Sequence, residues 1–469
     1  MTGISFNSFR EPAAVSEGLN IKEAAIVQAQ VKQSACVVSA VRMFSCLAIF
    51  FMSPADLMAQ AWVVQPGVSL EGIYDDNFRL SSVDAQEVTT ARVAGSLKLA
   101  RVTDTSDITG LVRVDGNAYF GDDEGLDDQS NQLLDFSYFT KGELSRWGGT
   151  ISFRRDTLLR SIRAIEGTDD PTLEPDPDVD EGLTRTNVER QRLSLGPSWS
   201  RFLTERTEVG LSYLFTDSSY HDVPVTPAGD DDIVDFQNHL VGGELLTRVT
   251  ERDRLALIFE GRRYEADDDA KFNNYDLQTG VVHDFSETFQ GRFTIGARYT
   301  EFDVPAEFDV DPVTGVPTLV RAAQEGDDTG FVATIGGVKR TGLTTFAGTL
   351  ERTASPSASG EIVQNDQLAL NVSRQLSERT EIIIRSTIYE TESLRDIRSN
   401  ANRRFIAVEP RLRYELSPSW ALEAAYEYRR IKEFDEPESA DSNAVMLSLN
   451  YELPVVVEPE APLDAFGID

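Results

Sequence analysis

The sequence predicts an all-β chain: a transmembrane up-and-down antiparallel β-barrel of about 18 strands, with short periplasmic turns and long acidic external loops. Apolar and polar residues alternate strictly over many runs, which is the period of a strand because successive Cβ atoms point to opposite faces. The runs are about 10 residues long, the length of a tilted strand that crosses a bilayer. One apolar face and one charged face suit lipid outside and water inside.

The clearest alternation lies in the closing strands, residues 403–453. In the first of them the apolar face holds Ile406, Val408, Pro410, Leu412, Tyr414 and Leu416. The opposite face holds Ala407, Glu409, Arg411, Arg413 and Glu415. A tight turn at Ser417–Trp420 leads into two further runs with the same period, so three neighbouring antiparallel strands are expected here.

The same reading, taken along the chain, gives the remaining strands as alternating runs between Gly, Asp and Ser clusters. They are expected at Gln65–Tyr74, Thr90–Ala100, Asp107–Phe120, Gln132–Leu144, Thr150–Leu159, Arg190–Arg201, Glu208–Ser218, Gln237–Arg248, Arg254–Ala266, Tyr275–Phe285, Gly291–Asp303, Gly330–Arg340, Thr344–Ser355, Asp366–Leu376 and Thr380–Ser393. An even number of strands places both barrel ends in the periplasm.

Turns and loops alternate along the chain. Short turns at Leu203–Glu208 and Leu376–Glu381 share a Ser/Thr-Glu-Arg pattern, and Thr250–Arg254 is a third version. A further short turn, without that pattern, is expected at Ser145–Gly148. The acidic clusters fall in the other connections, among them Asp267–Asp269 and Glu433–Asp441. A bacterial barrel has short periplasmic turns and longer external loops, so the acid is expected outside the cell.

The N-terminal residues are typical of an export leader. A short apolar stretch, Met43–Met52, precedes the small-residue pattern Ala59-Gln60-Ala61 of a cleavage site. We therefore expect residues 1–61 to be a leader with a signal peptide, 62–453 to be an outer-membrane barrel of a Gram-negative bacterium, and 454–469 to be a flexible periplasmic tail.

Composition narrows the class of protein. The chain has 469 residues and a net charge of −34, which argues against a nucleic-acid partner. Mean hydropathy is −0.28, and no run of about 18 apolar residues would make a transmembrane helix. Cys36 and Cys46 both lie in the leader, so the exported part carries no cysteine, which suits the periplasm.

Few residues suggest catalysis or cofactor binding. His221, His239 and His283 are too few and too scattered for a metal site, and no serine partner is singled out for His239. Asp176-Pro-Asp178-Val-Asp180 spaces carboxylates as a calcium loop does, but Glu181 and Asn187 depart from that pattern. We expect no enzyme, no cofactor and no metal site. The acidic loops are expected to be solvated, with lipopolysaccharide and membrane lipid as partners.

Charged residues on the polar faces are the candidate functional residues, since they would line the lumen. They are Arg92, Arg113, Asp115, Arg192, Arg262, Arg298, Arg385, Glu409, Arg411, Arg413, Glu415, Glu427 and Arg429. Guanidinium groups there could guide an anionic solute or polymer. Alternatively, acids on the same faces could consume the arginines in cross-strand ion pairs.

Two features carry a family resemblance: the segment Gly67–Phe78 just after the leader, and the repeated Ser/Thr-Glu-Arg-Thr turns. In this layout the chain resembles large β-barrel porin families of proteobacterial outer membranes, particularly those found with exopolysaccharide export systems. The resemblance implies a conduit for a secreted polysaccharide that works with a periplasmic export partner. With the lumen arginines as guides, we expect that polysaccharide to be acidic. Two alternatives stay open: a passive porin for small solutes, and a structural or adhesive barrel that does not conduct.

Overall fold

The computed structural model describes residues 62–121, 126, 129–158, 188–221, 233–310, 317–321, 323–356, 362–394, 402–434 and 438–453. The chain divides into two units, Met1–Ala61 and Trp62–Asp469, and only the second contains described residues. The expected leader, the tail at 454–469 and the calcium-like segment at Asp176–Asp180 lie outside the described residues.

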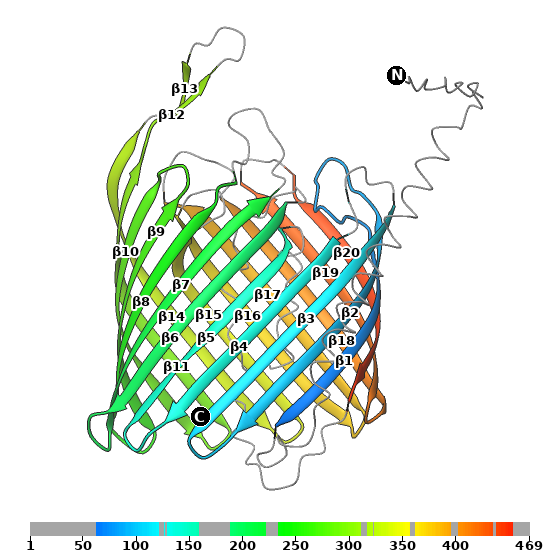
Figure 1. The fold of residues 1–469 in the computed structure, drawn as a ribbon, viewed down its shortest axis with the longest axis horizontal. Helices are drawn as coiled ribbons and strands as arrows, with labels where there is room; N and C mark the ends of the chain where they lie inside the picture. Colours follow the sequence, from blue (N-terminus) through cyan, green and yellow to red (C-terminus); the bar gives the residue numbers. More distant parts are fainter. Residues whose placement is uncertain are drawn as a thin grey trace, which may run out of the picture. The chain divides into compact units, whose positions relative to one another are not determined.

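An antiparallel sheet of 18 strands forms the second unit, and β1 pairs with both β2 and β20, so the sheet closes into a barrel (Figure 1). Its strands are β1 Val63–Asp75, β2 Val88–Val102, β3 Ser106–Gly121, β4 Gln129–Lys141, β5 Ser145–Thr157, β6 Glu189–Phe202, β7 Thr207–His221, β8 Phe236–Arg248, β9 Asp253–Ala266, β10 Lys271–Ser286, β11 Phe289–Val304, β14 Gln324–Thr341, β15 Thr344–Pro356, β16 Ile362–Ser377, β17 Thr380–Ser393, β18 Arg403–Ser417, β19 Trp420–Glu433 and β20 Ala440–Glu452. The expected fold class and strand number are confirmed.

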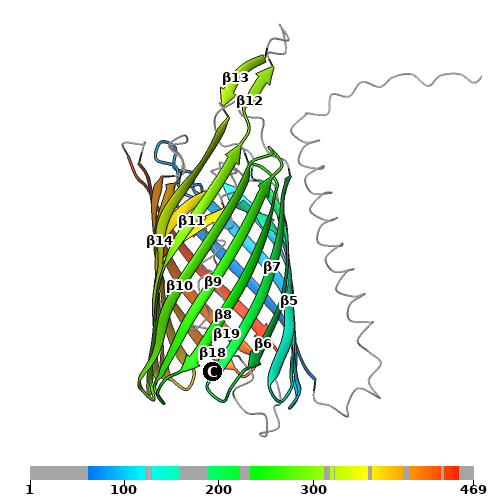
Figure 2. The same cartoon turned by 90° about the vertical axis from the view of Figure 1, so that its left-hand side faces the viewer.

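A small two-stranded sheet, β12 Glu307–Val310 with β13 Pro317–Arg321, lies between β11 and β14 in the chain. It projects beyond the end of the barrel (Figure 2). The sequence did not predict it, because neither strand is long enough to show a period. No helix in the described ranges is long and apolar enough to cross a membrane.

The two faces of the wall differ as the alternation predicts. Outward positions carry exposed apolar side chains such as Val68, Leu70, Val445 and Leu447, while inward positions beside them include Ser69 and Ser448. At the end with the short turns, the outward-facing Trp147 packs on Trp199 and Trp420 on Tyr451. An apolar band edged by aromatic rings is the surface that a barrel presents to a bilayer.

Three local expectations were wrong. The β4–β5 turn lies at Gly142–Leu144, where Gly142 N donates to Ser145 O (2.7 Å), and not at Ser145–Gly148. Gly148 lies within β5 opposite Phe139, where the Phe139 ring leaves no room for a Cβ and glycine is required. Strand β14 begins six residues before the expected Gly330, at Gln324. Asp267–Asp269 forms a tight turn rather than a long loop, with Asp269 at a φ of 65°.

Candidate functional site in the lumen

The strand register puts the predicted charged residues on the inner face of the wall. On that face lie Arg92, Arg113, Asp115, Arg192, Arg262, Arg298, Arg385, Glu409, Arg411, Arg413, Glu415, Glu427 and Arg429. Each occupies the same side of its strand as polar neighbours, while the apolar residues between them face outward. Whether they act on a solute depends on what each one contacts.

Arginines of the closing strands are held by acids on the same or the next strand. Glu409 contacts both Arg385 (3.5 Å) and Arg411 (3.0 Å), and Glu423 contacts both Arg411 (3.2 Å) and Arg413 (3.3 Å). This alternating chain of opposite charges runs along the inner face of β17, β18 and β19. The ion-pair alternative therefore describes these arginines better than free guanidinium groups do.

Arg429 forms a buried ion pair beside the closure of the barrel, at its long-loop end. Its Nη2 lies 2.5 Å from Oδ2 of Asp75 on β1 and also donates to Ser442 Oγ (2.9 Å) on β20. Ser442 donates in turn to Asp75 Oδ1, and Glu427 lies 3.7 Å from Arg429. The side chains of Arg429 and Asp75 are each 1% exposed. The pair thus spans the junction between the first and last strands.

Other predicted residues are similarly engaged. Arg92 binds Glu71 (2.9 Å) and Asn117, Arg298 lies 2.5 Å from Asp328, and Arg113 lies 3.8 Å from Asp115. Asp115 accepts from Asn131 Nδ2, and Arg192 donates to Ser218 Oγ. Glu415 faces the lumen at the short-turn end of β18.

The two ends of the lumen wall differ in exposure. Near the short turns, Lys98 and Arg146 are 46% and 55% exposed at their side chains. Near the long loops, most inward polar residues are buried, among them Arg190, Asp115, Asn274 and Glu427. The inner half of the wall is therefore open to water, whereas the outer half is covered.

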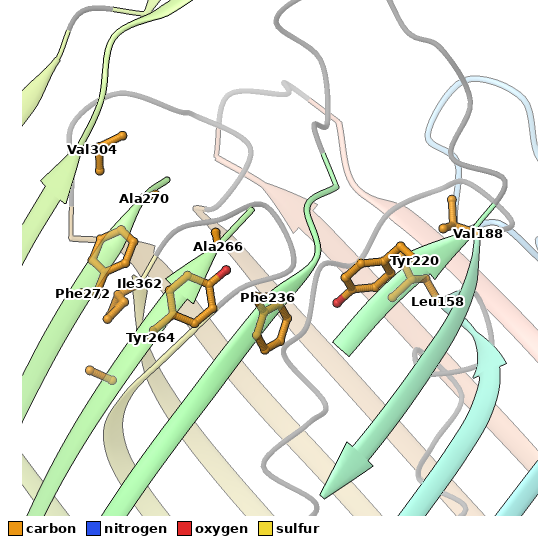
Figure 3. Close-up of a cluster of buried hydrophobic side chains, with 11 residues drawn as sticks. Leu158, Val188, Tyr220, Phe236, Tyr264, Ala266, Ala270, Phe272, Val304 and Ile362 are labelled. Atoms are coloured by element: carbon orange, nitrogen blue, oxygen red, sulfur yellow. The ribbon is translucent and has the colours of Figure 1, made fainter. Parts of the chain in front are cut away.

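An outer apolar cluster occupies part of that covered half. It consists of Leu158, Val188, Tyr220, Phe236, Tyr264, Ala266, Ala270, Phe272, Val304, Ala354 and Ile362. Four rings form a row across the inner faces of β7 to β10, with centroids 6.4 Å apart for Tyr220–Phe236, 5.0 Å for Phe236–Tyr264 and 5.6 Å for Tyr264–Phe272. Figure 3 shows this row with Ile362 and Leu158 beside it. The cluster places a hydrophobic core inside the barrel.

Arg262 bridges the lumen just below this cluster. Its Nη1 on β9 donates to the carbonyl oxygen of Ala354 on β15 (2.6 Å). Along the wall these strands are separated by β10, β11 and β14, a path of about 19 Å at the usual strand spacing. Strand β15 pairs with β14 only from Thr344 to Arg352, so the end of β15 that carries Ala354 can leave the wall. We infer that the contact narrows the outer lumen on this side.

The β1–β2 connection covers the opposite part of the outer lumen. Phe78 and Leu80 enter a loop cluster with Val88, Tyr389, Phe405, Ala407, Ile431 and Ala440. Asn77 fixes the connection by donating to the carbonyl oxygens of Ser81 and Asp441, both at 2.9 Å. Leu80 has a φ of 50°, a conformation that costs a bulky residue free energy and that the apolar packing must offset.

The histidines do not form a site. His239 lies on the outer face, where Nδ1 is 2.7 Å from the Tyr213 hydroxyl oxygen, and His283 pairs with Asp253 beside a short turn. His221 ends β7. Within the described ranges, no group of three or more His, Cys, Asp or Glu side chains is arranged to hold a metal ion.

Sequence reasoning missed the residues that close the outer lumen. Tyr264 and Phe272 keep the period of the inward face, two positions from Arg262 and Asn274. Apolar residues at lumen positions near a strand end were the available signal, since they need cover from water. Arg190 pairs with Asp156 at 3.0 Å. It follows the same period as Arg192, so it could have been included among the predicted lumen residues.

These features define a class of protein. A closed barrel with an even number of strands, an apolar aromatic-edged exterior and a polar lumen is an integral β-barrel of the Gram-negative outer membrane.

No family model matches the chain, and no curated protein is similar to it in sequence. The barrel is similar to OpdQ of Pseudomonas aeruginosa, with 10% sequence identity and a TM-score of 0.40 over 84% of this chain and 99% of that one. It is similar to OccAB4 of Acinetobacter baumannii with 11% sequence identity and a TM-score of 0.42, again over 84% of this chain and 99% of that one. The barrel is also similar to a BenF-like porin of Pseudomonas fluorescens Pf-5, with 10% sequence identity and a TM-score of 0.42. That match covers 83% of this chain and 99% of the porin. We draw no function from a likeness of this degree.

Proposed function

We propose that this protein is an outer-membrane channel for small solutes. The observation that carries the proposal is the Arg262–Ala354 bridge across a polar lumen. A barrel of 16 to 18 strands leaves an aqueous channel, and the exposure of Lys98 and Arg146 near the short turns supports a lumen that is open to water at that end. The bridge and the two apolar clusters narrow the outer half, so passage is restricted to small molecules.

Polysaccharide export, the expectation from the family resemblance, fits this lumen less well. A polymer has to thread through every level of the pore, and it would have to part both the Arg262–Ala354 bridge and the outer apolar cluster. The predicted arginine guides Arg385, Arg411 and Arg413 are held by Glu409 and Glu423. No observation favours export over small-solute diffusion.

Liposome swelling with solutes of graded size tests the proposal. Vesicles that contain the purified barrel should swell in monosaccharides and amino acids and should swell much more slowly in trisaccharides and longer oligosaccharides. Equal rates for a monosaccharide and a long oligosaccharide would favour a polymer conduit. Vesicles that never swell faster than empty ones would contradict a channel and favour a structural or adhesive barrel.

A further inference from the structure

Resting on the proposed channel function, we propose that the lumen between β8–β11 and β15–β16 holds a binding site for a small neutral polyhydroxylated solute, a monosaccharide or a polyol. The site lies beneath the outer apolar cluster, at the level where Arg262 reaches Ala354. It would give the channel a preference for a chemical class of solute rather than a size limit alone.

The first observation is a set of buried polar atoms without a hydrogen-bond partner, on strands that the Arg262–Ala354 contact brings together. On β8 to β11 they are Asn238 Oδ1, Arg262 Nε, Asp276 Oδ1 and Arg298 Nε; on β15 and β16 they are Ser355 Oγ, Asn365 Oδ1 and Gln367 Nε2. A buried polar group without a partner is costly and rare in folded proteins. So many near the Arg262–Ala354 contact in the strand register indicate a place built to be completed by polar groups from outside the chain.

The second observation is the mixture of donors and acceptors in this set. Arg262, Arg298 and Gln367 offer N–H donors, whereas Asn238, Asp276 and Asn365 offer acceptor oxygens. A hydroxyl group donates and accepts at once, so a sugar can satisfy both kinds. A dicarboxylate would satisfy only the donors, and a diamine only the acceptors.

Neighbouring contacts keep these groups in place. Asn274 Nδ2 donates to Asp276 Oδ2 (3.1 Å), and the Thr300 hydroxyl donates to Asn274 Oδ1 (2.6 Å). Arg298 is fixed by Asp328 at 2.5 Å. The free atoms of Asp276 and Arg298 therefore belong to side chains whose other atoms are already anchored, which lowers the entropic cost of binding.

Charge at this level is mixed in sign, which disfavours an anionic solute. Arg262 and Arg298 lie close to Asp276, Glu260 and Asp328 in the register of β9 to β14, and Glu351 lies opposite Gln367 on the other wall. The carboxylates therefore outnumber the guanidinium groups among these residues. Tyr264 and Phe272 lie two positions farther out than Arg262 and Asn274 on their strands. Both rings are buried in the outer apolar cluster and close this level of the lumen on its outer side.

Solute-dependent interruption of ion current in planar bilayers tests the site. D-glucose should interrupt the current through the wild-type barrel, whereas L-glutamate at the same concentration should do so far less. Gln367→Leu and Asn365→Leu should each weaken glucose binding by about threefold to tenfold, the effect of one neutral hydrogen bond. Gln367→Glu, which keeps the size but removes the donor, serves as a second variant if Gln367→Leu fails to fold.

The matched control is Asn450→Leu, a lumen amide on β20 that donates to Ser448 Oγ away from the site; it should leave glucose binding unchanged. Channels that conduct but respond equally to glucose in the wild type and both variants, or that respond more to glutamate, would overturn the site while leaving the channel function intact. A barrel that does not conduct at all would instead contradict the proposed function.

Discussion

Charged residues of the lumen act mainly on one another. Arg385, Arg411 and Arg413 share Glu409 and Glu423 along one wall. Arg262 differs, because its guanidinium binds a backbone carbonyl on a distant strand and keeps an unpartnered Nε. At the residue scale, therefore, position along the lumen decides whether an arginine supports the wall or faces the passage.

The buried Asp75–Arg429 pair gives a stability prediction at this scale. Arg429→Met leaves Asp75 as a buried carboxylate without its main counter-charge, and loss of one partner of a buried pair costs about 3–5 kcal/mol. Urea unfolding in lipid vesicles should show that loss. The double variant Asp75→Asn/Arg429→Met should be less destabilised than Arg429→Met alone.

The control for this prediction is Arg404→Met. Arg404 and Glu390 form an ion pair in which the side chains are 53% and 43% exposed, and an exposed pair contributes at most about 1 kcal/mol. Equal losses for Arg429→Met and Arg404→Met would contradict the role assigned to the strand junction.

At the scale of elements, the β1–β2 connection is a covering segment of the outer lumen that the structure describes in full. It is pinned by Asn77 and inserts Phe78 and Leu80 between strands far away in the sequence. Alternation cannot predict such a loop, because its side chains follow no period and their partners come from β17, β18 and β19. The sequence therefore predicts where the β1–β2 connection begins and ends, but not the course of its backbone.

Removing the two apolar anchors of this connection should widen the channel. Phe78→Ala/Leu80→Ala deletes buried packing worth a few kcal/mol at each residue, and this packing offsets the unfavourable left-handed backbone conformation at position 80. Vesicles with this variant should swell in a trisaccharide that the wild type largely excludes. Val83→Ala, at a residue that is 91% exposed, should swell as the wild type does; unchanged trisaccharide exclusion in the double variant would argue against a covering role for the loop.

At the scale of the whole molecule, the alternation carried most of the information. It predicted the closed barrel, the number of strands and the inward side of residues such as Arg92 and Glu427, because a period of two fixes both element and face. It could not predict the narrow outer lumen. The Arg262–Ala354 bridge joins residues that share no strand pairing, and closeness across a lumen leaves no period in the sequence.

Orientation of the wall relative to lipid can be tested within one strand. Leu447 faces outward on β20 and the adjacent Ser448 faces the lumen, opposite Glu423 and Glu71. Leu447→Arg puts a charge into lipid at a cost of about 2–4 kcal/mol, whereas Ser448→Arg gains two nearby carboxylates. Assembly yield and urea stability in vesicles should fall only for Leu447→Arg. Equal tolerance of both substitutions would contradict the assigned faces.

The central claim is that the lumen is an aqueous passage narrowed by a bridge in its outer half. Single-channel recording of the wild type and of Arg262→Ala, which removes the bridge to Ala354, tests it most directly. We expect discrete conductance steps for the wild type and larger steps for Arg262→Ala. Steps of the same size in both would contradict the narrowing at Arg262, and the absence of steps in both would contradict the passage itself.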